Sequence, residues 1–223
     1  VLILYADVPF VRIDTLKKLL ELHRNSNKSV TILTACVSDP SGYGRIVRDE
    51  KGCIKKIVEE SDAPEDVRRI REINTGIMIA RADFLFASLK EIGCDNAQGE
   101  FYLTDIVRMG YESDDVNSLM IEKEEEIMGI NTMEDLANAE ILLRLQINRK
   151  HMLNGVRIID PKNTFIDASV EIGNGNIIYP FSFIEGETRI GRNCIIYQGA
   201  RIKDCIIEDD VVVKPYCVME RAI

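Results

Sequence analysis

The feature that most constrains this chain is an isoleucine that recurs every six residues through its last third. The repeating positions are Ile166, Ile172, Ile178, Ile184, Ile190, Ile196 and Ile202, continued after a slip of one residue by Ile207, Val213 and Met219. A helix cannot hold a period of six on one face, and an ordinary strand would place an apolar residue at every second position. A prism of short strands accommodates the period, because each face takes one inward aliphatic side chain before the chain turns. The pattern therefore predicts a β-helix of hexapeptide repeats with about 18 residues per coil.

Composition excludes several classes of protein. The chain has 223 residues, 46% apolar and 29% charged, which is typical of a folded globular protein rather than a disordered one. Its apolar runs are only a few residues long, so we expect no membrane span. The net charge of −9 argues against nucleic-acid binding, and six scattered cysteines without a C-x-x-C pair favour reduced thiols in the cytoplasm. An acidic protein that handles phosphates needs a local cation, so a metal ion is expected at any phosphate site.

The first 131 residues alternate between patterns typical of strands and patterns typical of helices. Strand patterns cover 1–5, 30–35, 45–48, 53–59 and 72–80, and short ones at 120–121 and 127–130 close the set. Helical patterns cover 82–92, 104–110 and the segment after Asp14, which we expect to cap that helix. Such alternation predicts an α/β domain whose sheet is mostly parallel and carries helices on its faces.

Asp7 is the first candidate for a functional residue. It is the first charged residue after the apolar strand pattern at 1–5, from which only Ala6 separates it. In α/β sheets, ligands bind outside the carboxyl ends of the strands, where this carboxylate would lie. Aspartate also starts turns, and Pro9 follows shortly afterwards. The strand pattern alone leaves both interpretations open.

A long helix is predicted between the α/β segment and the repeats. Thr132 and Asp135 have the spacing of a capping box, and the following residues are rich in Ala, Leu and Glu without a proline before Gly155. The helix should end near Asn154. Because it separates two different sequence textures, we interpret it as a connecting arm.

Several local strings make a family resemblance specific. They are YADVP (5–9), GYGRIVRD (42–49), IVEE (57–60), EINTGI (72–77), NAQGEFYLTDI (96–106) and GINT (129–132). Together with the arm helix and the hexapeptide repeats, the whole chain resembles the bifunctional N-acetylglucosamine-1-phosphate uridyltransferase / glucosamine-1-phosphate N-acetyltransferase family. The resemblance implies an α/β nucleotidyltransferase domain with a Rossmann-like mixed sheet at 1–133. A helical linker arm at 134–154 and the start of a left-handed parallel β-helix at 155–223 would follow.

The resemblance also implies roles for individual residues, although it assigns no catalytic side chain. The implied substrate-binding residues are Tyr5, Ala6, Asp7, Gly44, Glu59, Asn74 and Asn131. Asp7 and Asn131 would coordinate Mg²⁺, an ion that takes oxygen ligands and is held by few protein groups. Tyr5 and Ala6 would lie along the nucleotide, and the family usually has glycine in place of Ala6. The remaining three would line the sugar pocket.

Three of these residues also have ordinary structural interpretations. Without the resemblance, we would interpret Glu59 as a solvated strand end, because a second glutamate follows it. Asn74 can satisfy backbone groups at the start of its strand. Asn131 directly precedes Thr132 and can take part in capping the long helix.

The implied activity joins UTP and N-acetylglucosamine 1-phosphate, releases pyrophosphate and makes UDP-N-acetylglucosamine for peptidoglycan and lipopolysaccharide precursors. The second implied activity acetylates glucosamine 1-phosphate with acetyl-CoA, and the expected assembly is a cytoplasmic homotrimer. The family's Gly-rich phosphate loop is missing before Asp7 and only about three coils of repeats are present, so we expect a fragment with impaired activity. Two alternatives stay open: another sugar-1-phosphate nucleotidyltransferase, for example one making ADP-glucose or GDP-mannose, and a non-catalytic subunit that trimerises through its β-helix.

Overall fold

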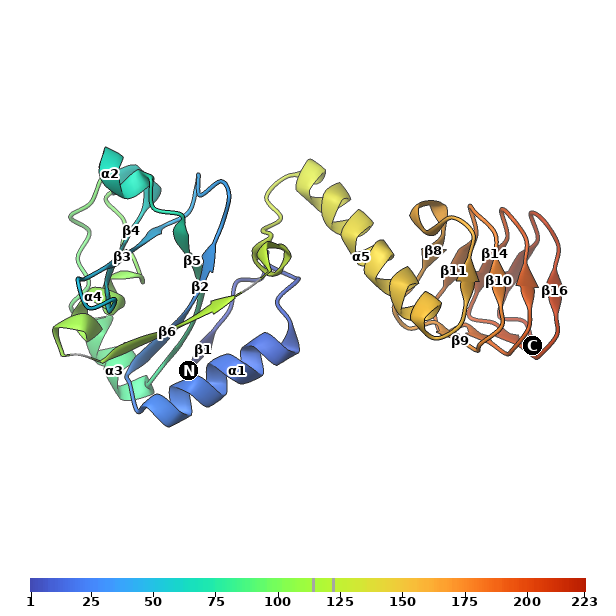
Figure 1. Ribbon diagram of the computed structural model, residues 1–223, viewed down its shortest axis with the longest axis horizontal. Coiled ribbons are helices and arrows are strands. Elements are labelled where there is room, and N and C mark those ends of the chain that lie inside the picture. The colour runs from blue at the N-terminus through green and yellow to red at the C-terminus, as the bar shows by residue number, and fades with distance from the viewer. Residues whose placement is uncertain (114, 122) are drawn as a thin grey trace. The chain divides into compact units, whose positions relative to one another are not determined.

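The structure is a computed structural model that describes residues 1–113, 115–121 and 123–223. The chain forms two compact units, Val1–Ile130 and Asn131–Ile223 (Figure 1). No helix among the described residues is both long and apolar enough to cross a bilayer. Each unit has its own hydrophobic core, so each is described separately below.

The first unit consists of a six-stranded sheet with helices around it (Figure 1). Its strands are β1 (Leu2–Ile3), β2 (Val30–Cys36), β3 (Arg45–Arg48), β4 (Ile54–Val58), β5 (Glu72–Ala80) and β6 (Val116–Ile121). Its helices are α1 (Ile13–Ser26), η1 (Glu60–Asp62), α2 (Glu65–Arg68), α3 (Ala82–Ser88), α4 (Asp105–Glu112) and η2 (Glu124–Ile127).

The expectation of a mostly parallel sheet is wrong. The strand order is β4-β3-β5-β2-β6, with β1 also paired to β5. Among the described strand pairs of this unit, only β2 and β6 run parallel, whereas β5 is antiparallel to β1, β2 and β3. The long central strand β5 inserts between two strands that precede it in the chain. Because one of the described strand pairs is parallel and the others are antiparallel, the sheet is mixed, which confirms the mixed sheet that the resemblance implies.

Helices cover both faces of this sheet (Figure 1). On one face, Leu19 of α1 packs in a cluster with Leu33 of β2. On the other face, Leu85 of α3 and Ile106 of α4 share a cluster with Ile32. Because neighbouring residues of a strand point to opposite faces, β2 has an apolar residue or a buried threonine at every position up to Ala35. This explains why the sequence of β2 shows no alternation of polar and apolar residues.

Two local expectations in this unit are also wrong. Asp14 does not cap α1, because Arg12 is the N-cap and Asp14 lies in the first turn. Residues 127–130 do not form a strand, since η2 ends at Ile127 and the chain then runs on without regular structure. The strand predicted at 120–121 is the end of a longer one, β6, whose first residues include polar side chains at the edge of the sheet.

The second unit begins with the predicted long helix, α5 (Met133–Leu153). The capping box is confirmed: the Thr132 hydroxyl accepts from the Asp135 backbone N–H at 3.1 Å, and the Asp135 carboxylate accepts from the Thr132 N–H at 2.8 Å. These two bonds satisfy backbone donors that the first turn of a helix leaves unpaired.

After α5 the chain winds into a parallel β-solenoid of hexapeptide repeats, which confirms the predicted fold class. Its strands are β7 (Arg157–Ile158), β8 (Phe165–Ile166), β9 (Glu171–Ile172), β10 (Ile177–Ile178), β11 (Phe183–Glu185), β12 (Arg189–Ile190), β13 (Ile195–Ile196), β14 (Arg201–Lys203), β15 (Ile206–Ile207), β16 (Val212–Val213) and β17 (Val218–Glu220), with η3 (Pro161–Asn163) after β7. They form three parallel sheets, β7-β10-β13-β16, β8-β11-β14-β17 and β9-β12-β15. In the second sheet, Ile184 pairs with Ile166 and Ile202, each 18 residues away along the chain. The repeated aliphatic side chains point inward and form one core.

Candidate functional site

The end of β1 leads into a turn that carries three of the predicted site residues. Ala6 and Asp7 lie between Tyr5 and Val8, and the Val8 N–H approaches the Tyr5 carbonyl at 3.5 Å. The Asp7 side chain is exposed and makes no hydrogen bond to any part of the chain that the structure describes. The turn therefore does not use the carboxylate, which leaves both of its oxygens available to a ligand.

A bulge in β5 lies against Tyr5. Residues 74–78 of β5 face only residues 32–34 of β2, so β5 carries extra residues at this point. Gly76 in the bulge has a φ of +77°, and a Cβ built on it would lie 1.9 Å from the Tyr5 ring. Glycine thus meets two needs here, a left-handed backbone and close approach of an aromatic ring. Bulges of this kind redirect nearby groups and are frequent next to active sites.

Asn74 stands at one end of the bulge and is only 8% exposed. Its backbone N–H donates to the Gly44 carbonyl at 2.8 Å, and its side-chain oxygen accepts from the Gly76 N–H at 3.1 Å. The oxygen therefore has the structural duty considered above. The side-chain nitrogen donates to no acceptor among the described residues, so it remains available to a ligand.

Glu59 follows β4 and is held in place rather than freely solvated. The Thr104 hydroxyl, at the start of α4, donates to Glu59 Oε1 at 2.9 Å, and Thr104 is only 7% exposed. The other oxygen, Oε2, lies close to Gly44: a Cβ built on Gly44 would be only 2.9 Å from it. Gly44 thus brings its backbone against the carboxylate, and through Gly44 the Glu59 and Asn74 positions adjoin one another.

Tyr5 belongs to the same neighbourhood, because its ring lies against Gly76, whose N–H donates to Asn74. Burial raises the pKa of its phenol above the ordinary value, and the nearby carboxylates of Glu59 and Asp7 raise that pKa further. The phenol is therefore protonated at neutral pH and can donate a hydrogen bond. Tyr5, Gly44, Glu59 and Asn74 accordingly form one cluster next to the turn that carries Asp7.

Asn131, the second predicted metal ligand, is the first residue of the second unit. The residue before it, Ile130, donates its backbone N–H to the Asp7 carbonyl at 2.8 Å. The backbone N–H of Asn131 donates to Asp135 at 3.1 Å, so part of this residue serves the start of α5. The assignment of Asp7 and Asn131 as a metal pair stays a prediction.

The donor set of this predicted pair suits Mg²⁺. Within the described residues no group of three or more His, Cys, Asp or Glu side chains could hold a metal ion. One exposed carboxylate and one amide are, however, the kind of ligands that Mg²⁺ accepts, because it keeps most of its water molecules. The residues present therefore fit the ion that the resemblance implies.

A cavity of about 470 Å³ lies beside Glu59. Its lining includes Lys56, Asp62, Asn96, Tyr102 and Arg108. The loop on this side is fixed by the Asn96 side-chain oxygen, which accepts from the backbone N–H groups of residues 98 and 100 at 3.2 and 3.1 Å. Three residues of the segment NAQGEFYLTDI, namely Asn96, Tyr102 and Asp105, thus line this cavity.

Sequence reasoning missed two residues of this site, Gly76 and Thr104. Both lie inside strings quoted above, yet neither received a role. A glycine within a strand is a known signal for a bulge, so Gly76 could have been found from its position. The role of Thr104 depends on its contact with a residue 45 positions away, which no local pattern shows.

The cluster is suited to binding a polyhydroxylated ligand. Glu59 offers a fixed acceptor, Asn74 offers a donor, and Gly44 exposes backbone between them because it lacks a side chain. Asp7 adds an exposed charge that can hold a cation for a phosphate group. None of these side chains is a nucleophile placed next to a base, so the geometry favours positioning and charge compensation.

Comparison with known proteins agrees with both units. The sequence model described as nucleotidyl transferase matches residues 1–145, and the model described as bacterial transferase hexapeptide (six repeats) matches residues 169–204. The first match covers all the candidate site residues, and the second lies within the solenoid.

Curated relatives match almost the whole chain. A protein named Bifunctional protein GlmU from Caldanaerobacter subterraneus subsp. tengcongensis is 48% identical over 93% of this chain and 45% of its own length. Proteins of the same name from Clostridium botulinum and Thermosipho africanus are 41% and 46% identical over 99% and 96% of this chain, and 48% and 50% of their own lengths. The chain therefore spans about half the length of the curated relatives it matches. Because the nucleotidyl transferase model covers the larger part of it, the chain belongs to the nucleotidyl transferase family.

Proposed function

We propose that this protein takes part in making UDP-N-acetylglucosamine and pyrophosphate from UTP and N-acetylglucosamine 1-phosphate. The observation that carries the proposal is the cluster of Gly44, Glu59 and Asn74 beside the Asp7 turn, in a chain whose relatives bear the name Bifunctional protein GlmU. The sugar would lie against Glu59 and Asn74, with its phosphate toward Asp7. Tyr5 and Ala6 would lie along the nucleotide.

The chemistry requires little from the side chains beyond positioning. An oxygen of the sugar phosphate attacks the α-phosphorus of UTP in line, the bond to the bridging oxygen breaks, and pyrophosphate leaves with both electrons of that bond. Enzymes of this family work with a divalent cation, and we propose Mg²⁺ held by Asp7 and Asn131, which would offset charge on the phosphates. Glu59 and Asn74 fix the sugar so that its phosphate oxygen is in line with the leaving group.

The solenoid suggests the second activity of the proposed function. Hexapeptide repeats at 169–204 match a family of bacterial transferases, and we propose acetylation of glucosamine 1-phosphate by acetyl-CoA in the full-length protein. We propose a cytoplasmic location, because all six cysteines are free thiols, as is usual for proteins of a reducing compartment. The proposed assembly is a homotrimer.

The proposal is tested on the full-length protein by following pyrophosphate release with different substrate pairs. UTP with N-acetylglucosamine 1-phosphate should be the preferred pair. Preference for ATP or GTP with another sugar phosphate would favour a different sugar nucleotidyltransferase. No turnover with any pair, together with an intact trimer, would favour the non-catalytic subunit.

Asp7→Ala should abolish uridyl transfer, because it removes a proposed ligand of Mg²⁺. It should leave acetyl transfer intact, because the Asp7 carboxylate is exposed and holds no part of the fold in place. The two activities of the full-length protein are measured separately on the same preparation. Loss of both would show that the substitution unfolds the protein, and retention of uridyl transfer would remove Asp7 from the metal site.

A further inference from the structure

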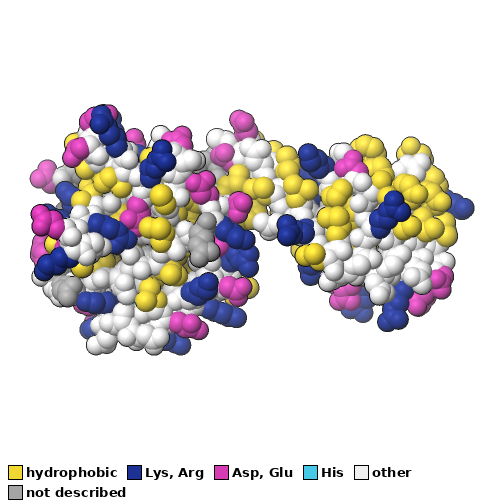
Figure 2. Space-filling view, viewed as in Figure 1, with side chains coloured by type: hydrophobic (Ala, Val, Ile, Leu, Met, Phe, Trp, Pro, Cys, Tyr) yellow, Lys and Arg dark blue, Asp and Glu magenta, His cyan; other side chains and the backbone are white. Residues whose placement is uncertain are grey.

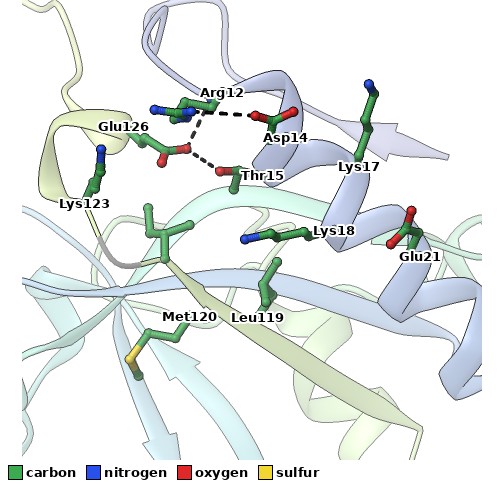
Figure 3. A pocket seen from close by; sticks show the side chains of 11 residues that line it. Arg12, Asp14, Thr15, Lys17, Lys18, Glu21, Leu119, Met120, Lys123 and Glu126 are labelled. Carbon is green, nitrogen blue, oxygen red and sulfur yellow. Dashed lines mark hydrogen bonds and ion pairs between the residues drawn. The ribbon is translucent and has the colours of Figure 1, made fainter.

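A buried carboxylate joins the start of α1, which follows the Asp7 turn in the chain, to a segment more than 100 residues later. Glu126 of η2 is 6% exposed, and its Oε2 accepts from the Thr15 hydroxyl at 2.6 Å and from the Arg12 backbone N–H at 3.2 Å (Figure 3). Both donors belong to the start of α1, which has no cap from its own sequence. Glu126 therefore supplies, from more than 100 residues away, the acceptor that the first turn of α1 lacks.

The chemistry of this contact is unusual for a surface helix end. Glutamate is seldom buried without a cationic partner, because its charge loses hydration. Arg12 forms its ion pair with Asp14 at 3.6 Å, and among the described residues no cation pairs with Glu126. The carboxylate is thus held by neutral donors and by the dipole of the helix start, which favours negative charge.

A second tie lies close by and connects the same two segments. Ile130, four residues after Glu126, donates its N–H to the Asp7 carbonyl at 2.8 Å. The segment 7–15, which leads from the turn into α1, is therefore fastened at both ends to the segment 126–130.

We propose that Glu126 is a positioning residue for the proposed metal ligand Asp7: it fixes the segment 126–130, whose Ile130 N–H bonds the Asp7 carbonyl, and thereby holds the Asp7 turn in place. The inference rests on the proposed function for its consequence, but the clasp itself, formed by Glu126, Thr15 and the Arg12 N–H, is a property of the first unit. Because both bonds end on one oxygen, the clasp requires an acceptor at that point and not a charge.

The groove around the clasp gives a direct way to separate these two possibilities. Glu126 and Thr15 line a cavity of about 550 Å³ together with the lysines at 17, 18 and 123 (Figure 3). If the carboxylate acted through its charge toward these lysines, Glu126→Gln would abolish its effect. If it acts as an acceptor for Thr15 and the Arg12 N–H, Glu126→Gln retains it and Glu126→Ala removes it.

The first experiment measures hydrogen exchange at the Ile130 amide in the full-length protein by mass spectrometry of short peptides. In Glu126→Ala this amide should exchange roughly tenfold faster, the fold-change that corresponds to losing about 1.4 kcal/mol of local hydrogen bonding. Glu126→Gln should match the wild type. The matched control is Glu124→Ala, which removes a bond from the same 3₁₀ helix to the Ser38 N–H at 2.8 Å and should leave Ile130 unchanged.

The second experiment measures uridyl transfer against Mg²⁺ concentration in the same variants. Glu126→Ala should raise the Mg²⁺ concentration for half-maximal rate at least fivefold, whereas the KM for UTP at saturating Mg²⁺ should change less. Thr15→Val, which removes one of the two donors without emptying the site, should shift the Mg²⁺ requirement in the same direction by a smaller factor. Thr15→Val also keeps the proposal testable if the Glu126→Ala variant fails to fold.

The outcomes separate the inference from the proposed function. Unchanged Ile130 exchange in both Glu126→Ala and Thr15→Val would overturn the clasp. Faster exchange with an unchanged Mg²⁺ requirement would overturn its role in positioning. Absence of uridyl transfer in the wild type would overturn the proposed function, and the exchange experiment would still decide whether the clasp exists.

Discussion

At the scale of single residues, the two polar side chains of the proposed sugar pocket can be altered without breaking their structural bonds. Glu59→Gln keeps an oxygen for the Thr104 hydroxyl, and Asn74→Asp keeps the oxygen that accepts from the Gly76 N–H. Each should raise the KM for the sugar phosphate up to about tenfold, because one hydrogen bond to a ligand is lost. The KM for UTP should change less. An unchanged KM for the sugar phosphate would return both residues to structural duty.

Gly44 allows the same pocket to be tested through space rather than chemistry. A Cβ at Gly44 would lie 2.9 Å from Glu59 Oε2 and 2.9 Å from a methyl carbon of Ile57. Gly44→Ala should therefore displace the Glu59 carboxylate and raise the KM for the sugar phosphate. The control is Gly52→Ala in the β3–β4 turn, where no atom lies within 4 Å of the new methyl group, although its φ of +83° adds backbone strain. It should lower stability without changing the KM.

One ion pair between β3 and β5, formed by Arg48 and Glu72, should make stability depend on pH. Burial acts to raise the pKa of Glu72, but hydrogen bonds at 2.6 and 2.8 Å from Arg48 and its charge outweigh burial, so the pKa lies below its ordinary value. A lowered pKa contributes stability above the unfolded value of about 4.3, and this contribution disappears as the pH falls through the folded value. Glu72→Gln should therefore lower the free energy of unfolding by roughly 1–2 kcal/mol at pH 7.

This difference between Glu72→Gln and the wild type should shrink steadily in urea unfolding curves recorded from pH 5 down to pH 3. The matched control is Glu65→Gln, which breaks the exposed pair with Arg69 at 3.4 Å and should cost almost nothing at any pH. A difference that stays constant with pH would contradict the ionic origin of the stabilisation.

At the scale of elements, the start of α5 offers a clean measurement of a helix cap. Thr132→Ala removes the acceptor for the Asp135 N–H at 3.1 Å and should lower the free energy of unfolding of the second unit by about 1 kcal/mol. Thr132→Ser keeps the hydroxyl and should cost much less. Chemical denaturation followed by far-ultraviolet circular dichroism measures both variants. Equal losses would show that the methyl group of Thr132, not its hydroxyl, stabilises the helix.

The elements themselves were largely predictable, but their directions were not. The strand at 72–80 and the helix behind Thr132 have the predicted extents, because an apolar run and a capping box are local signals. The sheet was expected to be mostly parallel, because alternation of strands and helices does not reveal that β5 inserts between β2 and β3. Asp14 was expected to cap α1, because no local pattern shows that Glu126 approaches from the far end of the unit.

At the scale of the whole molecule, the candidate site depends on contacts between distant segments. The sequence pattern alone placed Asp7 at a strand end but left Glu59 as a solvated charge. In the structure, Glu59 is held by Thr104 and lies against Gly44, which in turn bonds Asn74. These contacts join residues up to 45 positions apart. The resemblance to a known family could therefore name these residues, whereas periodicity and spacing could not bring them together.

The repeats that dominate the sequence also suggest how copies of the chain associate. One outer face of the solenoid carries Ile177, Ile195 and Val212, which stack in register on three successive strands. Two residues after Ile177 and Ile195, the rings of Tyr179 and Tyr197 stack on one another with their centroids 5.0 Å apart. Figure 2 shows hydrophobic side chains gathered on the surface of the solenoid. An aliphatic stripe of this kind, partly open to solvent, is suited to contact the same stripe of another copy.

The resemblance implies a homotrimer, and we predict that it forms through this face and dissociates on dilution, because association depends on protein concentration by mass action. Ile195→Glu places a charge in the middle of the stripe and should shift the equilibrium to monomer by at least tenfold in concentration. The matched control is Arg189→Glu. Arg189 lies on β12, which pairs with β9 in a different sheet of the solenoid from the aliphatic stripe, so this change of charge should leave association unchanged. Sedimentation velocity over a range of concentrations measures both variants, and a stable dimer at all concentrations would contradict the trimer.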